Sequence, residues 1–258
     1  SNGADKRQIL QDADEIKTGE EFLERIDKII ASQGQHSRKE VKTLIAKGRV
    51  AAGGRVVSSS SEKVDPLTTQ ITIDGRPLEF KRNLYLILNK PKGYVSATED
   101  RDHPTVLELV PQEYRGRDLF PAGRLDRDTT GLMIITDDGV LAHNILAPKK
   151  HVPKLYHVKL DIPVTEEMRA GFLEGVMLND GVCKAADLLK TGEKTADVTL
   201  REGRYHQIKR MFGCFGAEVV ELKRLGMGKL MLPEDLEEGE CRELSAEELF
   251  ALSMACES

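Results

Sequence analysis

Apolar residues near the start of the chain recur at the spacing of a helix. Phe22, Ile26, Ile29 and Ile30 would share one side of a helix that ends at Gly34, a residue type common after helices. The segment before Phe22 is polar, acidic and only weakly periodic, as expected of a frayed helix or a mobile tail. The packed part of the chain is therefore predicted to begin with a helix at Phe22.

A second helix is predicted by a start signal, an apolar side and a stop signal. Ser37 and Glu40 have the spacing of a capping box, in which each side chain accepts a backbone N–H from the other residue. Gly48 is well suited to the position just after the helix. The apolar residues between these signals are Val41, Leu44 and Ile45.

Short strands joined by glycine turns follow the second helix. Residues 49–57 contain Gly53-Gly54 between two short runs, and residues 71–80 contain Asp74-Gly75 in a similar setting. Both dipeptides favour the tight turns of β-hairpins. Together with the two helices, these hairpins make residues 25–80 a small helix–turn–helix and β module.

The rest of the chain mixes strands and helices after a short linker at residues 81–83. The predicted strands are 84–88, 132–136, 155–160, 195–201 and 217–223, and the predicted helices follow Gly139 and cover 165–174. Because these elements do not alternate as regular βαβ units, residues 84–258 are expected to form an α+β domain on a mainly antiparallel sheet.

The charge of the chain is segregated. The net charge is −5, but residues 1–24, predicted to be an acidic extension or tag, sum to −4, and residues 233–258, predicted to be an acidic tail, sum to −8. The 208 residues between them sum to +7, of which residues 25–63 carry +6. A basic face of this kind suits nucleic-acid phosphates. A merely solvated basic face is the alternative.

Composition narrows the class of protein further. The four cysteines lie far apart and have no histidine at ligand spacing, so neither a disulfide framework nor a metal site is expected. No apolar run approaches the roughly 20 residues that cross a bilayer. No basic amphipathic stretch is long enough to bind a membrane surface. We expect a cytoplasmic protein, monomeric by preference, without metal or membrane partner.

One segment concentrates charged residues in a turn before an apolar strand. It reads Phe-Pro-Ala-Gly-Arg-Leu-Asp-Arg-Asp-Thr-Thr-Gly-Leu from Phe120 to Leu132. Its glycines permit backbone geometry or a close approach that a side chain would block. Its charged residues include Arg124, Asp126 and Asp128, of which Asp128 is expected to order the turn rather than to react. From these residues alone, a structural salt bridge between arginine and aspartate is the simpler explanation.

Gly-Arg-Leu-Asp followed by Thr-Gly-Leu resembles the signature of pseudouridine synthases, and three more motifs match that family. Lys154-Leu155-Tyr156 matches its tyrosine-bearing strand. Gly203–Arg210 matches its Gly-Arg-x-His-Gln segment, with Lys209 in the basic position, and Asn89–Gly93 matches its opening strand and turn. The resemblance covers residues 84 to about 245. It implies an enzyme that isomerises a uridine in RNA and needs no metal or organic cofactor.

The resemblance also implies roles for single residues. Asp126 would be the catalytic nucleophile, and because burial disfavours a charged carboxylate, a nearby cation is needed, for which Lys209 is the candidate. Tyr156 would stack on the extruded uracil or take a proton from the ribose C2′. Arg124 would fill the space of the flipped base or bind a phosphate. Attack of Asp126 on C1′, its attack on C6, and elimination to a glycal all stay open.

The residues after Gly203 predict a helix with a buried stripe. Ile208, Met211, Phe212 and Phe215 follow a helical period, so the helix would bury them and turn the polar residues away from the core. The predicted RNA contacts in this segment are Arg204, His206, Gln207 and Arg210. His206 and Gln207 are expected to contact RNA or support the fold rather than to take part in catalysis, and His206 is not expected to act as a base.

The N-terminal module resembles the S4 RNA-binding domain. The resemblance rests on Arg25-Ile26-Asp27-Lys28, Ser37-Arg38 and Lys47-Gly48-Arg49-Val50. It implies an RNA-binding face with the basic residues Arg38, Lys39, Lys42, Arg49 and Arg55. A small basic module that binds protein is the alternative.

An S4 module joined to this catalytic domain resembles the RsuA-like family of bacterial ribosomal RNA pseudouridine synthases. Residues 98–106 and the Asp-Thr-Thr-Gly variant at 128–131 are most similar to members that act on small-subunit (16S) RNA, with large-subunit (23S) RNA as the alternative. A non-catalytic S4-type assembly factor would be favoured by loss of Asp126, Tyr156 or Lys209, and all three are present. Phosphate-binding glycine motifs are absent from the sequence, which argues against a nucleotide enzyme.

Overall fold

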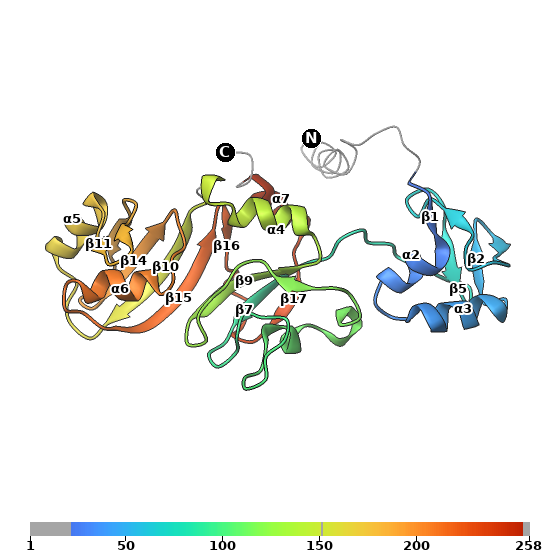
Figure 1. The fold of residues 1–258 in the computed structure, drawn as a ribbon, viewed down its shortest axis with the longest axis horizontal. Coiled ribbons are helices and arrows are strands. Elements are labelled where there is room, and N and C mark those ends of the chain that lie inside the picture. Colours follow the sequence, from blue (N-terminus) through green and yellow to red (C-terminus); the bar gives the residue numbers. More distant parts are fainter. Residues whose placement is uncertain (1–21, 151, 255–258) are drawn as a thin grey trace. The chain divides into compact units, whose positions relative to one another are not determined.

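The structure of the protein is a computed structural model whose described residues are 22–150 and 152–254 (Figure 1). The predicted acidic extension therefore lies, up to residue 21, outside the described residues. The chain forms two compact units. The first consists of the chain up to Leu84 together with Pro111–Asp118, and the second of Tyr85–Val110 and the chain from Leu119 onward.

The segment Pro111–Asp118 lies in the first unit, although its place in the chain predicted that it belongs to the catalytic domain. The buried side chain of Arg117 explains this position. Its guanidinium donates to Gln33 Oε1 at 3.3 Å and to the backbone oxygens of Lys81 and Arg82, each at 3.1 Å. Such contacts depend on groups far apart in the chain, so local pattern does not reveal them.

The first unit combines two helices with short antiparallel strands. Four strands pair in the order β3-β2-β5-β6, and β1 pairs with β4. The elements are β1 Glu24–Arg25, α2 Ile26–Ser32, α3 Arg38–Ala46, β2 Val50–Ala52, β3 Arg55–Val56, β4 Lys63–Val64, β5 Ile71–Ile73, β6 Arg76–Pro77 and the 3-10 helix η2 Gln112–Tyr114.

Most local signals of this unit act as predicted. Ser37 and Glu40 form the capping box at the start of α3, and Gly48 after its end has φ +67°. The turn between β5 and β6 places Asp74 and Gly75 at φ +52° and +77°, as a tight hairpin turn requires. The helix predicted from Phe22 begins only at Ile26, because Glu24–Arg25 form backbone hydrogen bonds with β4 as a strand instead.

The second unit is built on a nine-stranded sheet. Its main path runs β13-β14-β10-β15-β9-β7-β17, with β16 on β15 and β8 on β9. Among the described strands of this sheet only β15 and β9 run parallel, which confirms the predicted α+β fold on a mainly antiparallel sheet. β11 and β12 form a separate hairpin.

The strands of this unit are β7 Tyr85–Lys90, β8 Phe120–Pro121, β9 Thr130–Thr136, β10 Lys154–Leu160, β11 Met177–Leu178, β12 Gly181–Val182, β13 Asp187–Lys190, β14 Thr195–Leu200, β15 Val219–Met227, β16 Leu230–Met231 and β17 Cys241–Glu243. The helices are α4 Gly139–Leu146, α5 Glu166–Glu174, α6 Gln207–Gly213, α7 Ala246–Ser253 and the 3-10 helices η1 Val106–Leu109 and η3 Pro148–Lys150. None of the helices in the described part of the chain is long and apolar enough to cross a membrane.

Two apolar clusters hold this unit together. One contains residues of α5 and α6 with β10, β14 and β15, and the other contains residues of α4 and α7 with β7 and β9. α6 contributes Ile208, Met211 and Phe212 to the first cluster, as the sequence predicts. Phe215 lies beyond the end of α6 but packs against the same cluster and contacts the ring of Phe172.

The predicted acidic tail is instead packed structure up to Ser253. β17 pairs with β7, and α7 begins with a capping box of Ser245 and Glu248. Leu252 of α7 is fully buried. The net negative charge of this segment concealed these elements, because α7 needs only one side of its surface to be apolar.

Candidate active site

The sequence motifs converge on one row of the large sheet. In that row Lys90 of β7 pairs with Gly131 of β9, Gly131 with Arg224 of β15, and Arg224 with Tyr156 of β10. Neighbouring strands lie about 4.8 Å apart, so the row gathers residues from four distant parts of the chain. The loop that carries Asp126 leads directly into β9 beside this row.

The buried ammonium group of Lys90 fixes the loop that carries Asp126. Lys90 Nζ donates to the backbone oxygens of Asp126 (3.1 Å), Arg127 (3.2 Å) and Thr129 (2.8 Å), and to that of Pro91 (3.0 Å). Burial lowers the pKa of Lys90 to about 8, and nearby carboxylates partly offset this effect. No carboxylate among the described residues forms an ion pair with Lys90, so carbonyl oxygens compensate for its buried charge.

Lys90→Met is expected to lower the free energy of unfolding by roughly 2–4 kcal/mol, because the loop carbonyls lose a charged donor. For a chain of this size the melting temperature should fall by about 5–15 °C, measured by thermal denaturation. Lys92→Met, at an exposed neighbouring position, is the matched control and should shift it by less than about 2 °C. Equal melting temperatures for the two variants would contradict the anchoring role of Lys90.

Gly131 allows β9 and β15 to approach closely beside the site. Its φ is +103°, and a Cβ atom there would lie 2.2 Å from the backbone oxygen of Arg224. Gly123 also has φ +103°, and a Cβ there would lie 3.0 Å from the Leu146 side chain. Gly131 therefore needs to be glycine for both of the predicted reasons. Its backbone geometry is unusual, and another strand approaches it closely.

Two side chains flank the Asp126 carboxylate. Lys209 Nζ lies 3.4 Å from Asp126 Oδ2, and His206 Nε2 lies 3.3 Å from Asp126 Oδ1. Lys209 lies on α6, whose apolar side is buried, and His206 is the residue that precedes α6, with a left-handed φ of +48°. The predicted proximity of Lys209 to Asp126 is therefore present, and His206 contacts the same carboxylate, which the sequence did not predict.

Lys209 is shared by two carboxylates. Its Nζ donates to Asp128 Oδ1 at 2.7 Å and to Asp128 Oδ2 at 2.9 Å. Partial burial raises the pKa of Asp128, but the hydrogen bond and charge of Lys209 outweigh this and hold that pKa below its usual value. Partial burial lowers the pKa of Lys209, but Asp128 and Asp126 outweigh this and hold that pKa above its usual value. Both shifts keep the ion pair charged at neutral pH.

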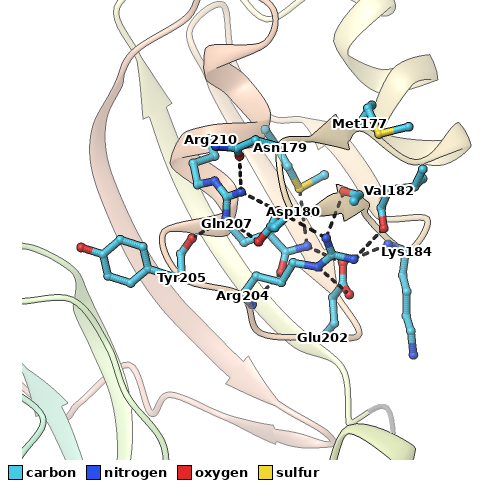
Figure 2. Close-up of polar contacts among 12 residues, drawn as sticks. Met177, Asn179, Asp180, Val182, Lys184, Glu202, Arg204, Tyr205, Gln207 and Arg210 are labelled. Carbon is cyan, nitrogen blue, oxygen red and sulfur yellow. Dashed lines mark hydrogen bonds and ion pairs between the residues drawn. The ribbon is translucent and has the colours of Figure 1, made fainter.

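A network of polar contacts holds the turn before α6 (Figure 2). Arg204 donates to the backbone oxygens of Gly181, at 3.0 Å, and Val182, at 2.6 Å. Arg210 donates to both carboxylate oxygens of Asp180 and, at 2.8 Å, to Asn179 Oδ1. Arg204 and Arg210, which were predicted to contact RNA, thus form hydrogen bonds within the protein.

Gln207 belongs to the same network. It is 3% exposed, its amide nitrogen donates to Glu202 Oε1 at 2.7 Å, and its amide oxygen accepts the backbone N–H of Arg204 at 3.0 Å. These contacts support the expected role of Gln207 in the fold, because they hold the turn before α6. An RNA contact of Gln207 stays a prediction.

Comparisons with known proteins agree with this architecture. A sequence profile described as RNA pseudouridylate synthase matches residues 84–213, about half of the chain, and an S4 domain profile matches residues 24–67. An uncharacterized RNA pseudouridine synthase of Bacillus subtilis (strain 168) is 43% identical over 234 residues, which cover 89% of this chain and 98% of that protein.

The chain belongs to the RNA pseudouridylate synthase family. The ribosomal small subunit pseudouridine synthase A of Escherichia coli (strain K12) is 41% identical over 231 residues, which cover 88% of this chain and 99% of that relative. The fold is similar to a crystal structure of a pseudouridylate synthase, with a TM-score of 0.63 and 38% sequence identity. The match covers 88% of this chain and 99% of the chain in that crystal structure. The protein is an RNA pseudouridine synthase with an N-terminal S4 domain.

Two further residues with predicted roles in catalysis or base flipping, Tyr156 and Arg124, lie near the Asp126 loop and the row of residues across the sheet. Tyr156 lies in the row described above and packs, half-buried, against the apolar cluster of α5 and α6. The described residues Tyr156 and Asp126 share no hydrogen bond. Arg124 is exposed, two residues before Asp126, and forms no hydrogen bond or ion pair with any other described residue.

The residues of the S4 domain that are predicted to contact RNA fall into two groups, which differ in whether an acidic residue pairs with them. Arg38, Lys39 and Lys42 are exposed on α3. Arg49 and Arg55 are exposed but pair with Asp74 and Glu62, which neutralises part of the basic surface that the sequence assigned to the hairpin. The RNA contacts of this domain stay predictions, and α3 is their strongest part.

Several residues of the site escaped sequence reasoning. Lys90 stands at the end of an apolar strand that was predicted to end at Leu88, and Arg224 lies on the buried side of β15, one residue beyond the strand predicted at 217–223. In both cases one signal was available: a charged residue falls on the side of the strand that the pattern predicts to be buried. Asp180 carried no local signal, since its partner Arg210 lies in another segment. Glu202 and Tyr205 contact neighbours in their own turn, but no periodicity or capping pattern marks those contacts.

Proposed function

We propose that this synthase isomerises a uridine in small-subunit (16S) ribosomal RNA, with Asp126 as its nucleophile. The observation that carries the proposal is the Asp126 carboxylate flanked by Lys209 and His206. The target is supported by relatives of 41–42% identity that are named ribosomal small subunit pseudouridine synthase A. Residues 98–106 and 128–131 support the same target by resemblance.

The proposed reaction is an isomerisation in which all atoms are kept. The N1–C1′ glycosidic bond breaks and a C5–C1′ bond forms, while C5 loses its proton and N1 ends with one. Asp126 would attack C1′ of the ribose or C6 of the base, or the Tyr156 hydroxyl would accept a proton from C2′ on the way to a glycal. In each route Lys209 would hold positive charge beside the Asp126 carboxylate, 3.4 Å from its Oδ2.

The target base must leave its stack before it can reach Asp126. Extrusion costs a few kcal/mol, and the vacated space must be filled. Arg124 is suited to this role because its exposed guanidinium is planar and can stack while it pairs with a phosphate. Tyr156 would offer a ring face to the extruded uracil.

Reversal of charge on α3 tests the proposed role of the S4 domain. Lys39→Glu combined with Lys42→Glu is expected to weaken RNA binding at least about 10-fold at low salt and to reduce the slope of log affinity against log salt by about 2. Binding isotherms at several salt concentrations measure both. Lys194→Glu combined with Lys229→Glu, at exposed positions of the second unit, makes the same charge change and should leave most of the slope intact. Equal slopes for the two double variants would remove α3 as the docking surface.

Carbodiimide-probed primer extension tests the function directly. Unmodified 16S and 23S RNAs and pre-ribosomal particles are incubated with the wild-type protein or with Asp126→Asn, and stops in extension mark pseudouridine. A new stop in 16S RNA that requires Asp126 is the expected result. A stop confined to 23S RNA would overturn the target and keep the chemistry. No stop in any RNA, with folded protein, would favour a binding factor.

We further propose that the synthase acts as a monomer in the cytoplasm. The three described cysteines are free, as a reducing compartment allows, and the names of several relatives refer to the ribosomal small subunit. Sedimentation of the purified chain at several concentrations would test the monomer, and a concentration-dependent shift to a dimer would overturn that part.

A further inference from the structure

Tyr205 is an aromatic side chain that the structure leaves in solvent. Its exposed fraction is 77%, in a chain with five tyrosines and no tryptophan. An aromatic residue that remains exposed forgoes the stabilisation of burying 150–250 Å² of surface. Exposed aromatic rings are common on protein surfaces, so exposure alone does not indicate a function. The position of Tyr205 relative to Asp126 is the feature that does.

The ring of Tyr205 stacks on a residue that contacts Asp126. The ring centroids of Tyr205 and His206 lie 3.8 Å apart at an interplanar angle of 19°. His206 Nε2 in turn lies 3.3 Å from Asp126 Oδ1. The three side chains therefore form a continuous series from the Asp126 carboxylate through the imidazole to the exposed ring.

The backbone under Tyr205 is held in place. Its carbonyl oxygen accepts a hydrogen bond from Arg210 Nη1 at 3.1 Å, and Arg210 is itself fixed by Asp180. His206 adopts the left-handed region at φ +48°, which is uncommon for a residue with a side chain. Figure 2 shows the network gathered on one side of the turn, with the Tyr205 ring directed away from it. The ring is thus presented by a rigid turn.

We propose that Tyr205 is a stacking site for a nucleobase next to the target uridine in the RNA strand. This inference rests on the proposed function. Because His206 stands between Tyr205 and Asp126, the nucleotide that reacts at Asp126 and the base on Tyr205 are different nucleotides. One face of the Tyr205 ring is covered by the imidazole, so the opposite face receives the base. Every nucleobase has a π face, so the contact contributes affinity with little sequence preference.

The magnitude of such a contact is measurable. Removal of an aromatic stacking partner of a single-stranded base weakens binding by about 5- to 150-fold. Tyr205→Ala is therefore expected to raise KM by this factor and to leave kcat within about 2-fold, whereas Tyr205→Phe keeps both. If the ring served only to hold His206 against Asp126, Tyr205→Ala would lower kcat instead, and that result would overturn the proposal.

A tryptophan at this position reports the stack directly. Tyr205→Trp gives a chain with a single tryptophan, whose fluorescence a stacked base should quench. Val140→Trp, at a position 73% exposed on α4, is the matched single-tryptophan control. On titration with a 16S RNA transcript, quenching of Tyr205→Trp but not of Val140→Trp is expected. Equal quenching of both variants, or quenching of neither, would overturn the proposal.

The same titration separates this inference from the proposed target. A 23S RNA transcript is tested in parallel, together with the primer-extension assay. Conversion confined to 23S RNA, with selective quenching of Tyr205→Trp by that RNA, would overturn the 16S target and support the stacking site. Conversion of 16S RNA by Tyr205→Ala with an unchanged KM would support the target and overturn the stacking site.

Discussion

Asp126→Asn is expected to abolish pseudouridine formation, with a loss of at least about 10⁴-fold in turnover. Asparagine keeps the size and shape of the side chain but is neither charged nor nucleophilic. RNA affinity should stay within about 3-fold, because the basic residues of α3 and of the site are unchanged. Single-turnover assays by carbodiimide-probed primer extension, with a parallel filter-binding isotherm, measure the two quantities.

Asp128→Asn is the matched control for this variant. It removes a carboxylate two residues away that also pairs with Lys209, so it makes the same charge change beside the same cation. Turnover of Asp128→Asn is expected to fall by about 10- to 100-fold, because Lys209 loses a partner but the proposed nucleophile remains. Turnover retained in Asp126→Asn, or equal losses in the two variants, would exclude Asp126 as the nucleophile.

Lys209→Met should reduce turnover by about 10²- to 10³-fold, the usual cost of removing one preorganised charged group from a site. Its ammonium is the cation shared by Asp126 and Asp128, and methionine leaves these two carboxylates without it. Stability should change little, since ion pairs of half-exposed groups contribute at most about 1 kcal/mol. The melting temperature should therefore shift by no more than about 4 °C.

Lys209→Arg completes this test. It retains the positive charge with a different shape, so partial recovery of turnover is expected relative to Lys209→Met. Turnover and thermal denaturation are measured on the same preparations. A collapse of the melting temperature in Lys209→Met, with turnover per folded molecule unchanged, would mean that the ion pair is purely structural.

Most elements of the fold could be predicted because their signals are local. The capping box of Ser37 and Glu40, the glycine turns of the hairpins and the stripe of α6 each lie within one short segment. Periodicity and capping are read from neighbouring residues, and the structure follows them. Predictions that depended on where a segment ends were less accurate, as Phe22 shows, because strand pairing with a distant segment competes with helix formation.

The candidate site was only partly predictable. The motifs identified Asp126, Tyr156 and Lys209 by resemblance, and the contact between Asp126 and Lys209 is present. No local pattern indicated that Lys209 is shared with Asp128, or that Arg204 and Gln207 form hydrogen bonds within the protein. Residue type alone does not distinguish a guanidinium that faces RNA from one that bonds a backbone carbonyl.

Local patterns in the chain were enough to infer the family, the two-part organisation, the main helices and strands and the residues of the motif around Asp126. The groups that meet around Asp126 became known only from tertiary contacts: the Lys90 ammonium that bonds the loop, Gly131 against Arg224, and His206 beside Asp126. The physical reason is that periodicity and capping depend on burial and hydrogen bonding within one segment. Contacts between distant segments depend on sheet register and helix packing, which local spacing does not specify.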